Sequence, residues 1–180
     1  QLFPIHIAAN KADSANGTPW NAIDANGVIQ PTMADMELAL RRADSAGMIS
    51  YNPGMDSFQI VDESKLNPAQ INALSGMKDK LSEAGGTGVA QLLSTVLFDA
   101  LDHVVVYPVA DENGWKDGEG RVLPDAFVVP NKIEAKALAY KVHSDLGDGF
   151  IKAVDGRTRR VVGADHECGD SDVIKIHAKA

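Results

Sequence analysis

The order of apolar segments between residues 103 and 180 constrains the fold more than any other feature of this sequence. These segments predict two strands, one amphipathic helix and three further strands. The helix carries one apolar stripe between Ala135 and Leu146 and is expected to end at Gly147. Such a stripe needs a sheet face to cover it, so we expect a small mixed sheet packed on one helix. The expected strands cover residues 104–109, 126–129, 150–154, 160–162 and 173–177.

The first 102 residues show a different order, namely strand, loop, strand and then helices. Three helices are expected in this part of the chain. The second is expected to begin at Asn67-Pro68 and end at Gly85-Gly86. The third carries a continuous apolar stripe that predicts a core-facing helix, with Thr87 as its N-cap. The predicted fold class is therefore α/β followed by an α+β domain of the β-grasp type. The expected strands cover residues 3–9 and 28–29, and the other expected helices residues 36–46 and 88–101.

Composition narrows the classes of protein that the chain can belong to. With 180 residues, of which 44% are hydrophobic and 23% charged, the chain can bury a core without disulfide bonds. Its single cysteine, Cys168, excludes an internal disulfide and a thiolate metal cage, and the sequence predicts no metal centre and no catalytic residue. The net charge of −8 opposes a broad grip on nucleic acid, so any such contact must be local.

The sequence carries no targeting or membrane signal. No run approaches the ~18 consecutive apolar residues that cross a bilayer, and the first residues lack a signal-peptide pattern. We therefore expect a cytoplasmic protein with no membrane partner. The chain starts at Gln1 and enters a strand at once, which leads us to expect a piece of a longer protein.

A polar tetrapeptide, Asn10-Lys11-Ala12-Asp13, directly follows the first predicted strand and matches the NKxD element of GTPases. The Asp13 carboxylate suits guanine, because it can accept hydrogen bonds from the N1–H and the exocyclic amine, a donor pair that adenine lacks. Asn10 would tie neighbouring loops together and meet the base edge, and the stem of Lys11 would lie along the base. The alternative is a chance match in a polar exit from a strand.

A second loop follows the next predicted strand, in the order that a GTPase requires. There the backbone N–H of Ala34 is expected to meet the guanine O6, with Met33 at the position that usually holds serine. Loss of the serine hydroxyl predicts a reduced affinity for the base.

Further segments make the chain similar to the C-terminal portion of YchF-like, Obg-related GTPases of the archaeal type. The resemblance implies the end of a Rossmann-like P-loop GTPase domain at residues 1–102, with a helical insertion near 47–85 and a closing helix at 87–101, followed by a TGS β-grasp domain at 103–180. The matching segments include residues 7–13, 37–42, 86–89, 106–109, 111–113, 122–127, 138–147 and 172–176.

This resemblance implies a guanine-recognition half of a translation- or ribosome-associated GTPase that binds GTP and GDP. The sequence has no G-x-x-x-x-G-K-[ST] loop for phosphates, so Mg²⁺ is expected only together with a preceding phosphate-binding part, and the chain alone should be inactive. Intact Lys11 and Asp13 favour guanine over adenine. The alternative is a non-catalytic TGS module that binds RNA or protein beside vestigial G-domain elements.

The densest basic cluster is formed by Arg157, Arg159 and Arg160. The functional interpretation of this cluster is contact with RNA phosphates, which the TGS resemblance supports. The alternative is a solvated hairpin, because Asp155, Asp165 and Glu167 lie nearby in the sequence and reduce the local field.

The remaining polar candidates are interpreted as structural. His143 with Asp145, and His166 with Cys168, lack further ligands or a nucleophile at suitable spacing, so His143 is expected to complete a helix end and Cys168 to be buried. The start of the helix near Glu134 lacks the usual Thr or Ser cap of relatives, which the Glu134 side chain can replace only in part.

Overall fold

The computed structural model describes residues 5–14, 28–123 and 125–179. The chain divides into two compact units, residues 1–96 and 97–180. Each unit has its own cluster of buried apolar side chains, one between Met33 and Leu81 and the other between Val104 and Ile174. The two units are therefore described separately.

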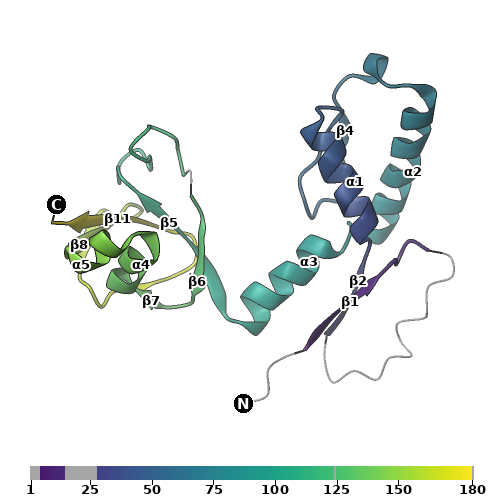
Figure 1. The fold of residues 1–180 in the computed structure, drawn as a ribbon. Helices are drawn as coiled ribbons and strands as arrows, with labels where there is room; N and C mark the ends of the chain where they lie inside the picture. The colour runs from purple at the N-terminus through teal and green to yellow at the C-terminus, as the bar shows by residue number, and fades with distance from the viewer. Residues whose placement is uncertain (1–4, 15–27, 124, 180) are drawn as a thin grey trace. The chain divides into compact units, whose positions relative to one another are not determined.

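The first unit contains a parallel strand pair, β1 (His6–Asn10) and β2 (Val28–Thr32), which Figure 1 draws side by side. Asn10 is paired with Thr32, so both strands end at the same edge of the pair. The polar segments that follow the two strands are brought together by this register. Residues 3 and 4 of the first predicted strand lie outside the described residues.

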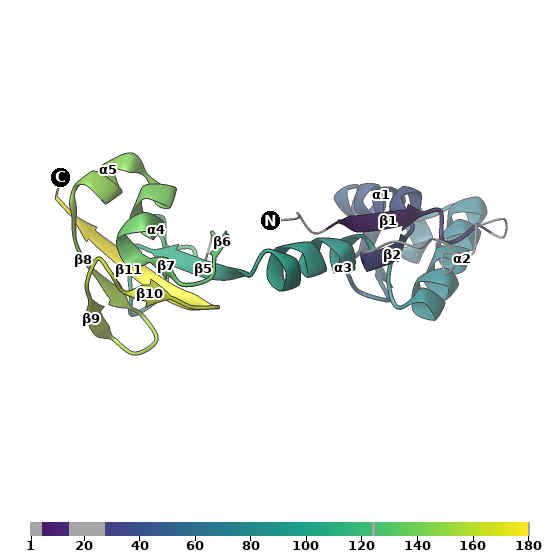
Figure 2. The same cartoon turned by 90° about the horizontal axis from the view of Figure 1, so that it is seen from below.

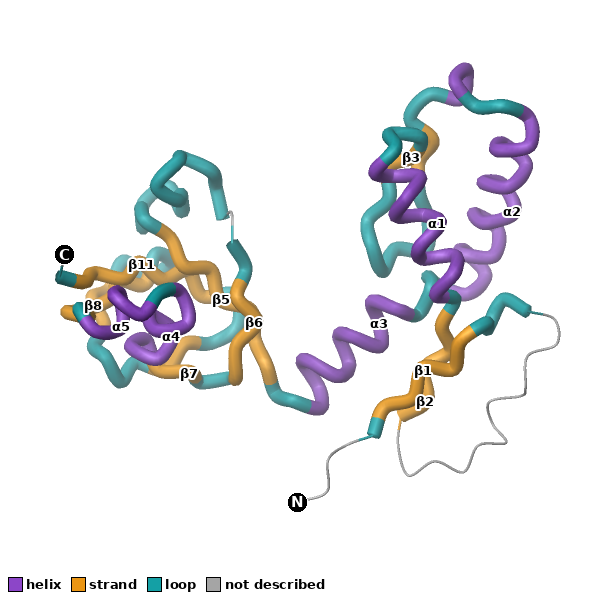
Figure 3. The backbone as a smooth tube through the Cα atoms, in the orientation of Figure 1, coloured by secondary structure: helices purple, strands orange, loops and turns teal. Residues whose placement is uncertain are grey.

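Helix α1 (Ala34–Ser45) starts directly after β2, two residues earlier than predicted. It is followed by Gly47 in a left-handed conformation, with φ of 68°. Between residues 47 and 67 the chain forms an antiparallel pair, β3 (Ile49–Ser50) and β4 (Gln59–Ile60), and the 3-10 helix η2 (Glu63–Lys65). Figure 3 shows strand and loop between α1 and α2, so the expected helical insertion is helical mainly in its second half.

Helix α2 (Pro68–Ala84) has the ends that the sequence predicts. The Asn67 side chain accepts from the Gln70 N–H at 2.9 Å, and the Gln70 side chain accepts from the Asn67 N–H at 2.9 Å. At the other end, Gly85 adopts φ of 70°. Leu74 and Leu81 bury the apolar face of α2 in the core of this unit.

The predicted helix over residues 88–101 forms as α3 (Val89–Ser94), which continues as a π-helix, η3 (Thr95–Ala100). The prediction that Thr87 caps it is wrong: Gly88 occupies the N-cap position, and the Thr87 hydroxyl donates to Glu37 instead. The expected core-facing stripe is also only half-buried in the described chain, since Leu93 is 55% exposed and Leu101 47% exposed.

The second unit is built on a five-stranded mixed sheet in the order β6-β5-β11-β8-β9. The central strand β11 pairs parallel with β5 and antiparallel with β8, and it runs through the middle of the sheet in Figure 2. This sheet with its covering helix confirms the predicted β-grasp type of fold. The bounds are β5 (His103–Val109), β6 (Phe127–Pro130), β8 (Phe150–Asp155), β9 (Arg160–Val162) and β11 (Asp172–Ala178).

The helical part of this unit is split into α4 (Ala135–Val142) and α5 (Ser144–Asp148). His143 separates them, because its ring Nδ1 accepts from the Asp145 N–H at 3.2 Å. A short antiparallel pair, β7 (Ile133–Glu134) and β10 (Glu167–Cys168), brings a loop to the start of α4. Among the helices of the described residues, none has the length and hydropathy required to cross a membrane.

Backbone carbonyls cap α4, and the Glu134 side chain makes no capping hydrogen bond. The N–H of Ala135 donates to the His166 carbonyl at 2.8 Å, and the N–H of Lys136 donates to the Ala164 carbonyl at 3.1 Å. These bonds satisfy donors that a Thr or Ser cap would otherwise serve. The expectation that Glu134 partly replaces the cap is therefore wrong.

Candidate functional site

The loops that follow β1 and β2 are tied together by two hydrogen bonds. The Asn10 side-chain oxygen accepts from the Ala34 N–H at 3.0 Å, and the Ala12 N–H donates to the Thr32 carbonyl at 3.0 Å. Between these bonds, Lys11 adopts a left-handed conformation with φ of 64° and turns the chain away from the strand. Residues 10–13 and 32–34 therefore form one continuous edge.

The hydrogen bond between Asn10 and Ala34 fixes the orientation of the Asn10 side-chain amide. A backbone N–H can be met only by the amide oxygen of Asn10, so the Asn10 NH₂ group points away from Ala34. The Ala34 N–H, which the sequence assigned to the guanine O6, is already used in this arrangement. The Asn10 NH₂ group is then the better placed donor for the edge of a base.

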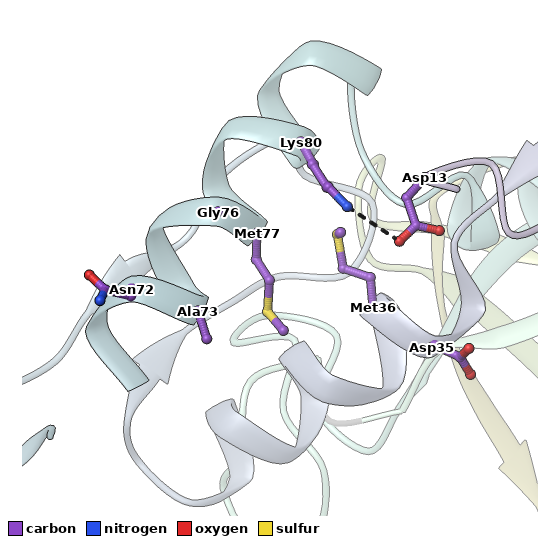
Figure 4. A pocket seen from close by; sticks show the side chains of 8 residues that line it. All are labelled: Asp13, Asp35, Met36, Asn72, Ala73, Gly76, Met77 and Lys80. Atoms are coloured by element: carbon purple, nitrogen blue, oxygen red, sulfur yellow. Dashed lines mark ion pairs between the residues drawn. The ribbon is translucent and has the colours of Figure 1, made fainter. Parts of the chain in front are cut away.

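Asp13 opens onto a surface hollow of about 320 Å³. Its side chain is 34% exposed, and its Oδ2 lies 3.8 Å from the Nζ of Lys80 on α2, a pairing drawn in Figure 4. This distance exceeds hydrogen-bond length, and both side chains remain exposed to solvent. Lys80 therefore does not hold the Asp13 carboxylate away from the hollow. The lining residues are Ala12, Asp13, Met33, Lys80, Glu83 and Ala84.

A second hollow, of about 390 Å³, shares Asp13 and Lys80 with the first and extends along α2. Figure 4 shows Met36 and Met77 on its walls and Asp35 at the start of α1. The inserted segment between α1 and α3 therefore supplies one wall of the site. Sequence reasoning missed Lys80, because nothing local connects it with a loop 67 positions earlier in the chain.

The Met33 side chain lies beneath the loop and is only 4% exposed. It belongs to the core of the first unit together with Met36 and Leu40. Met33 thus holds the loop by packing, in place of the hydrogen bond that a serine hydroxyl would make at this position.

Glu37, one turn into α1, is buried directly behind the same loop. Its Oε2 accepts from the hydroxyls of Tyr51 at 2.8 Å and Thr87 at 2.7 Å, and its Oε1 accepts from the Arg41 Nε at 2.6 Å. Burial alone would raise the pKa of Glu37, but the hydrogen bonds from Thr87, Arg41 and Tyr51 together lower it, so the group is a carboxylate at neutral pH. No local pattern in the sequence predicts this cluster.

The three arginines of the basic cluster lie on the hairpin between β8 and β9 and are all exposed. The Asp155 carboxylate accepts from the backbone N–H groups of Arg157 at 2.8 Å and Thr158 at 3.3 Å. Asp155 therefore organises the turn, and the side chains of Arg157, Arg159 and Arg160 project from a fixed hairpin.

The other polar candidates have structural roles. His143 caps α5, and Cys168 is fully buried, where desolvation raises the pKa of its thiol to about 12 and keeps it unreactive. In the described ranges, no group of three or more His, Cys, Asp or Glu side chains is arranged to hold a metal ion.

Residues 8–111 match the family described as Obg-like GTPase YGR210-like, G4 motif-containing domain, and residues 120–178 match the TGS domain. Over 98% of the chain, the sequence is 45% identical to the GTP-binding protein MJ1332 of Methanocaldococcus jannaschii. The crystal structure of a GTP binding protein from Pyrococcus horikoshii OT3 covers 98% of the chain with a TM-score of 0.65 and 35% identity. The chain spans 46% of the length of each of these two proteins.

Proposed function

Because the chain belongs to the Obg-like GTPase family of the YGR210-like type, we propose that residues 10–13 and 32–34 form the guanine-reading side of a GTP- and GDP-binding site. The observation that carries this proposal is the hydrogen bond between Asn10 and Ala34, which joins two loops beside the open hollow at Asp13. A base that enters this hollow would meet the Asp13 carboxylate, and the Asn10 amide is held on the loop edge beside it.

The chemistry of these groups favours guanine over adenine. The Asp13 carboxylate would accept from N1–H and from the exocyclic amine, and the Asn10 NH₂ group would donate to N7 and O6. The aliphatic stem of Lys11 would cover one face of the base. A site that hydrogen-bonds polar groups of its ligand rejects an analogue without them, because its own groups are then left unpaired.

Hydrolysis is proposed only for a protein that contains more than this chain. The sequence holds no Gly-rich phosphate loop, and the described residues offer no cluster that suits Mg²⁺. We therefore expect the 180 residues alone to bind GTP weakly and to turn it over negligibly.

We further propose a cytoplasmic, translation-linked GTPase, in which the buried thiol of Cys168 suits a reducing compartment.

Calorimetry on the full gene product that contains this chain tests the proposal. GDP should bind more tightly than ADP, and Asp13→Asn should weaken GDP binding by about tenfold or more, since it removes a charge-assisted acceptor. The same variant should bind xanthosine diphosphate better than the unchanged protein does, because the new amide can donate to the xanthine O2. Asp79→Asn, an exposed carboxylate on α2 that lines neither hollow, is the matched control and should leave GDP binding unchanged. Equal affinity of the unchanged protein for GDP and ADP would refute the proposal.

A second candidate function is RNA contact through the TGS domain. The observation that favours it is the set of three exposed arginines on the β8–β9 hairpin, whose turn is held by hydrogen bonds to Asp155. This candidate agrees with a binding module at residues 103–180 and a G-domain part at 1–102, a boundary that we propose from the sequence. It lies six residues after the division between the two compact units, which falls between residues 96 and 97. Both functions can coexist, because their residues lie in different units.

A further inference from the structure

The Glu37 carboxylate is buried, and a carboxylate is stable in such a position only when its oxygens have hydrogen-bond or ionic partners. The Glu37 side chain is 6% exposed, and burial of an unpaired charge is strongly unfavourable. All of its partners donate: Arg41 from the same helix, Tyr51 from the segment after β3, and Thr87 from the turn before α3. Glu37 therefore joins three separate segments of the first unit.

These bonds lead directly to the loop after β2. The Thr87 carbonyl accepts from the Met33 N–H at 2.8 Å, and the Glu37 N–H donates to the Met33 carbonyl at 3.0 Å. The second bond is a backbone bond that any residue at position 37 would make, so the Glu37 side chain acts on Met33 through Thr87. The next residue, Ala34, holds the Asn10 amide.

We propose that Glu37 is a positioning residue for guanine recognition, which acts through Thr87 and Met33 to fix the Ala34 N–H and hence the Asn10 amide. This inference rests on the proposed function. Glu37 lines neither hollow at Asp13, so it acts without touching the nucleotide. Asp13 is anchored by β1 and by the bond of Ala12 to Thr32, so its reading of the exocyclic amine is independent of Glu37.

The test compares nucleotides that distinguish the contact of Asp13 with the exocyclic amine from the contact of Asn10 with O6 and N7. Inosine diphosphate lacks the exocyclic amine, so the ratio of GDP to IDP affinity reports on Asp13, whereas ADP also lacks O6. Two variants break the cluster: Glu37→Met removes the acceptor, and Thr87→Val removes one donor and tests the same step if Glu37→Met fails to fold. Arg42→Met, an exposed residue of the same helix outside the cluster, and Thr87→Ser, which keeps the hydroxyl, are the controls. Displacement of a fluorescent GDP from the full gene product gives each affinity.

We expect Glu37→Met and Thr87→Val to weaken GDP binding by about tenfold and to lower the preference for GDP over ADP, with the GDP to IDP ratio unchanged. The two controls should match the unchanged protein. Partial unfolding would scale all affinities by one factor, because it reduces only the competent fraction. An equal loss for all three nucleotides would therefore overturn the inference and leave Glu37 a structural role. If the unchanged protein shows no preference for GDP over ADP, the proposed function itself fails, and this inference with it.

Discussion

Lys80 lies beside Asp13, and its effect on the proposed base site follows from the length and exposure of their contact. The Nζ–Oδ2 distance is 3.8 Å, and the two side chains are 52% and 34% exposed. Exposed pairs of this kind contribute about 0–1 kcal/mol. We expect Lys80→Met to change the affinity for GDP by less than about fivefold, which is the factor that corresponds to this free energy.

Lys78→Met, on the same helix but outside both hollows, is the matched control, and titration calorimetry at two salt concentrations is the measurement. A gain of tenfold or more in GDP affinity on loss of Lys80 would show that the ammonium group blocks Asp13. That result would contradict the open arrangement of the carboxylate.

The residues of the site differ in how far sequence could predict them. Asn10, Lys11 and Asp13 are adjacent, and their position after a strand is a local signal. Glu37 and Thr87 are separated by 50 positions, and each has an ordinary local interpretation, as a helical glutamate and as an N-cap. Only the packing of α1 against the turn before α3 brings the two together, so the cluster follows from tertiary structure.

At the scale of elements, local signals succeeded where both partners are close in sequence. The Asn67-Pro68 start of α2 is self-contained, since the capping box uses Asn67 and Gln70 only. The start of α4 is different, because its caps are the carbonyls of Ala164 and His166, which arrive through the pairing of β7 with β10. A search for Thr or Ser before the helix cannot find such a cap.

The turn between α2 and α3 contains three glycines with positive φ, and two of them, Gly85 and Gly88, differ in their surroundings. A Cβ on Gly88 would lie 1.9 Å from the Pro31 carbonyl oxygen, whereas a Cβ on Gly85 would meet nothing within 4 Å. Gly85→Ala should therefore cost only the left-handed strain, about 1–2 kcal/mol. Gly88→Ala adds a steric clash with β2 and should cost about 2–5 kcal/mol in total.

Urea unfolding followed by circular dichroism measures both costs. Gly88→Ala should also weaken nucleotide binding, because Pro31 and Thr32 lead into the loop that we propose reads the base, and Gly85→Ala should not. Equal destabilisation by the two substitutions would mean that the close packing of Gly88 against β2 is not a constraint on the fold.

At the scale of the whole molecule, the two units have separate cores and separate candidate ligands. The apolar cluster of the first unit supports the loops at Asn10 and Ala34, and that of the second supports the sheet that carries the arginine hairpin. The order of strands around one helix was enough to predict the second fold. The strands of the first unit are too few to define a complete sheet, and there the NKxD match carried the prediction.

The arginine hairpin is a basic segment of a chain whose net charge is −8. The salt dependence of RNA binding can show whether RNA contacts this hairpin or responds to the total charge of the protein. If Arg157, Arg159 and Arg160 contact phosphates of single-stranded RNA, their joint replacement by Gln should weaken binding and reduce the slope of log affinity against log salt by about 2, since each neutralised phosphate contributes about 0.7. Replacement of Arg42, Lys65 and Lys78 by Gln changes the net charge equally and removes exposed cations of the first unit. Fluorescence anisotropy with a labelled RNA, at several salt concentrations, should show the reduced slope for the hairpin variant alone. The same slope for both variants would mean that RNA responds to total charge, and the hairpin would then be an ordinary solvated turn.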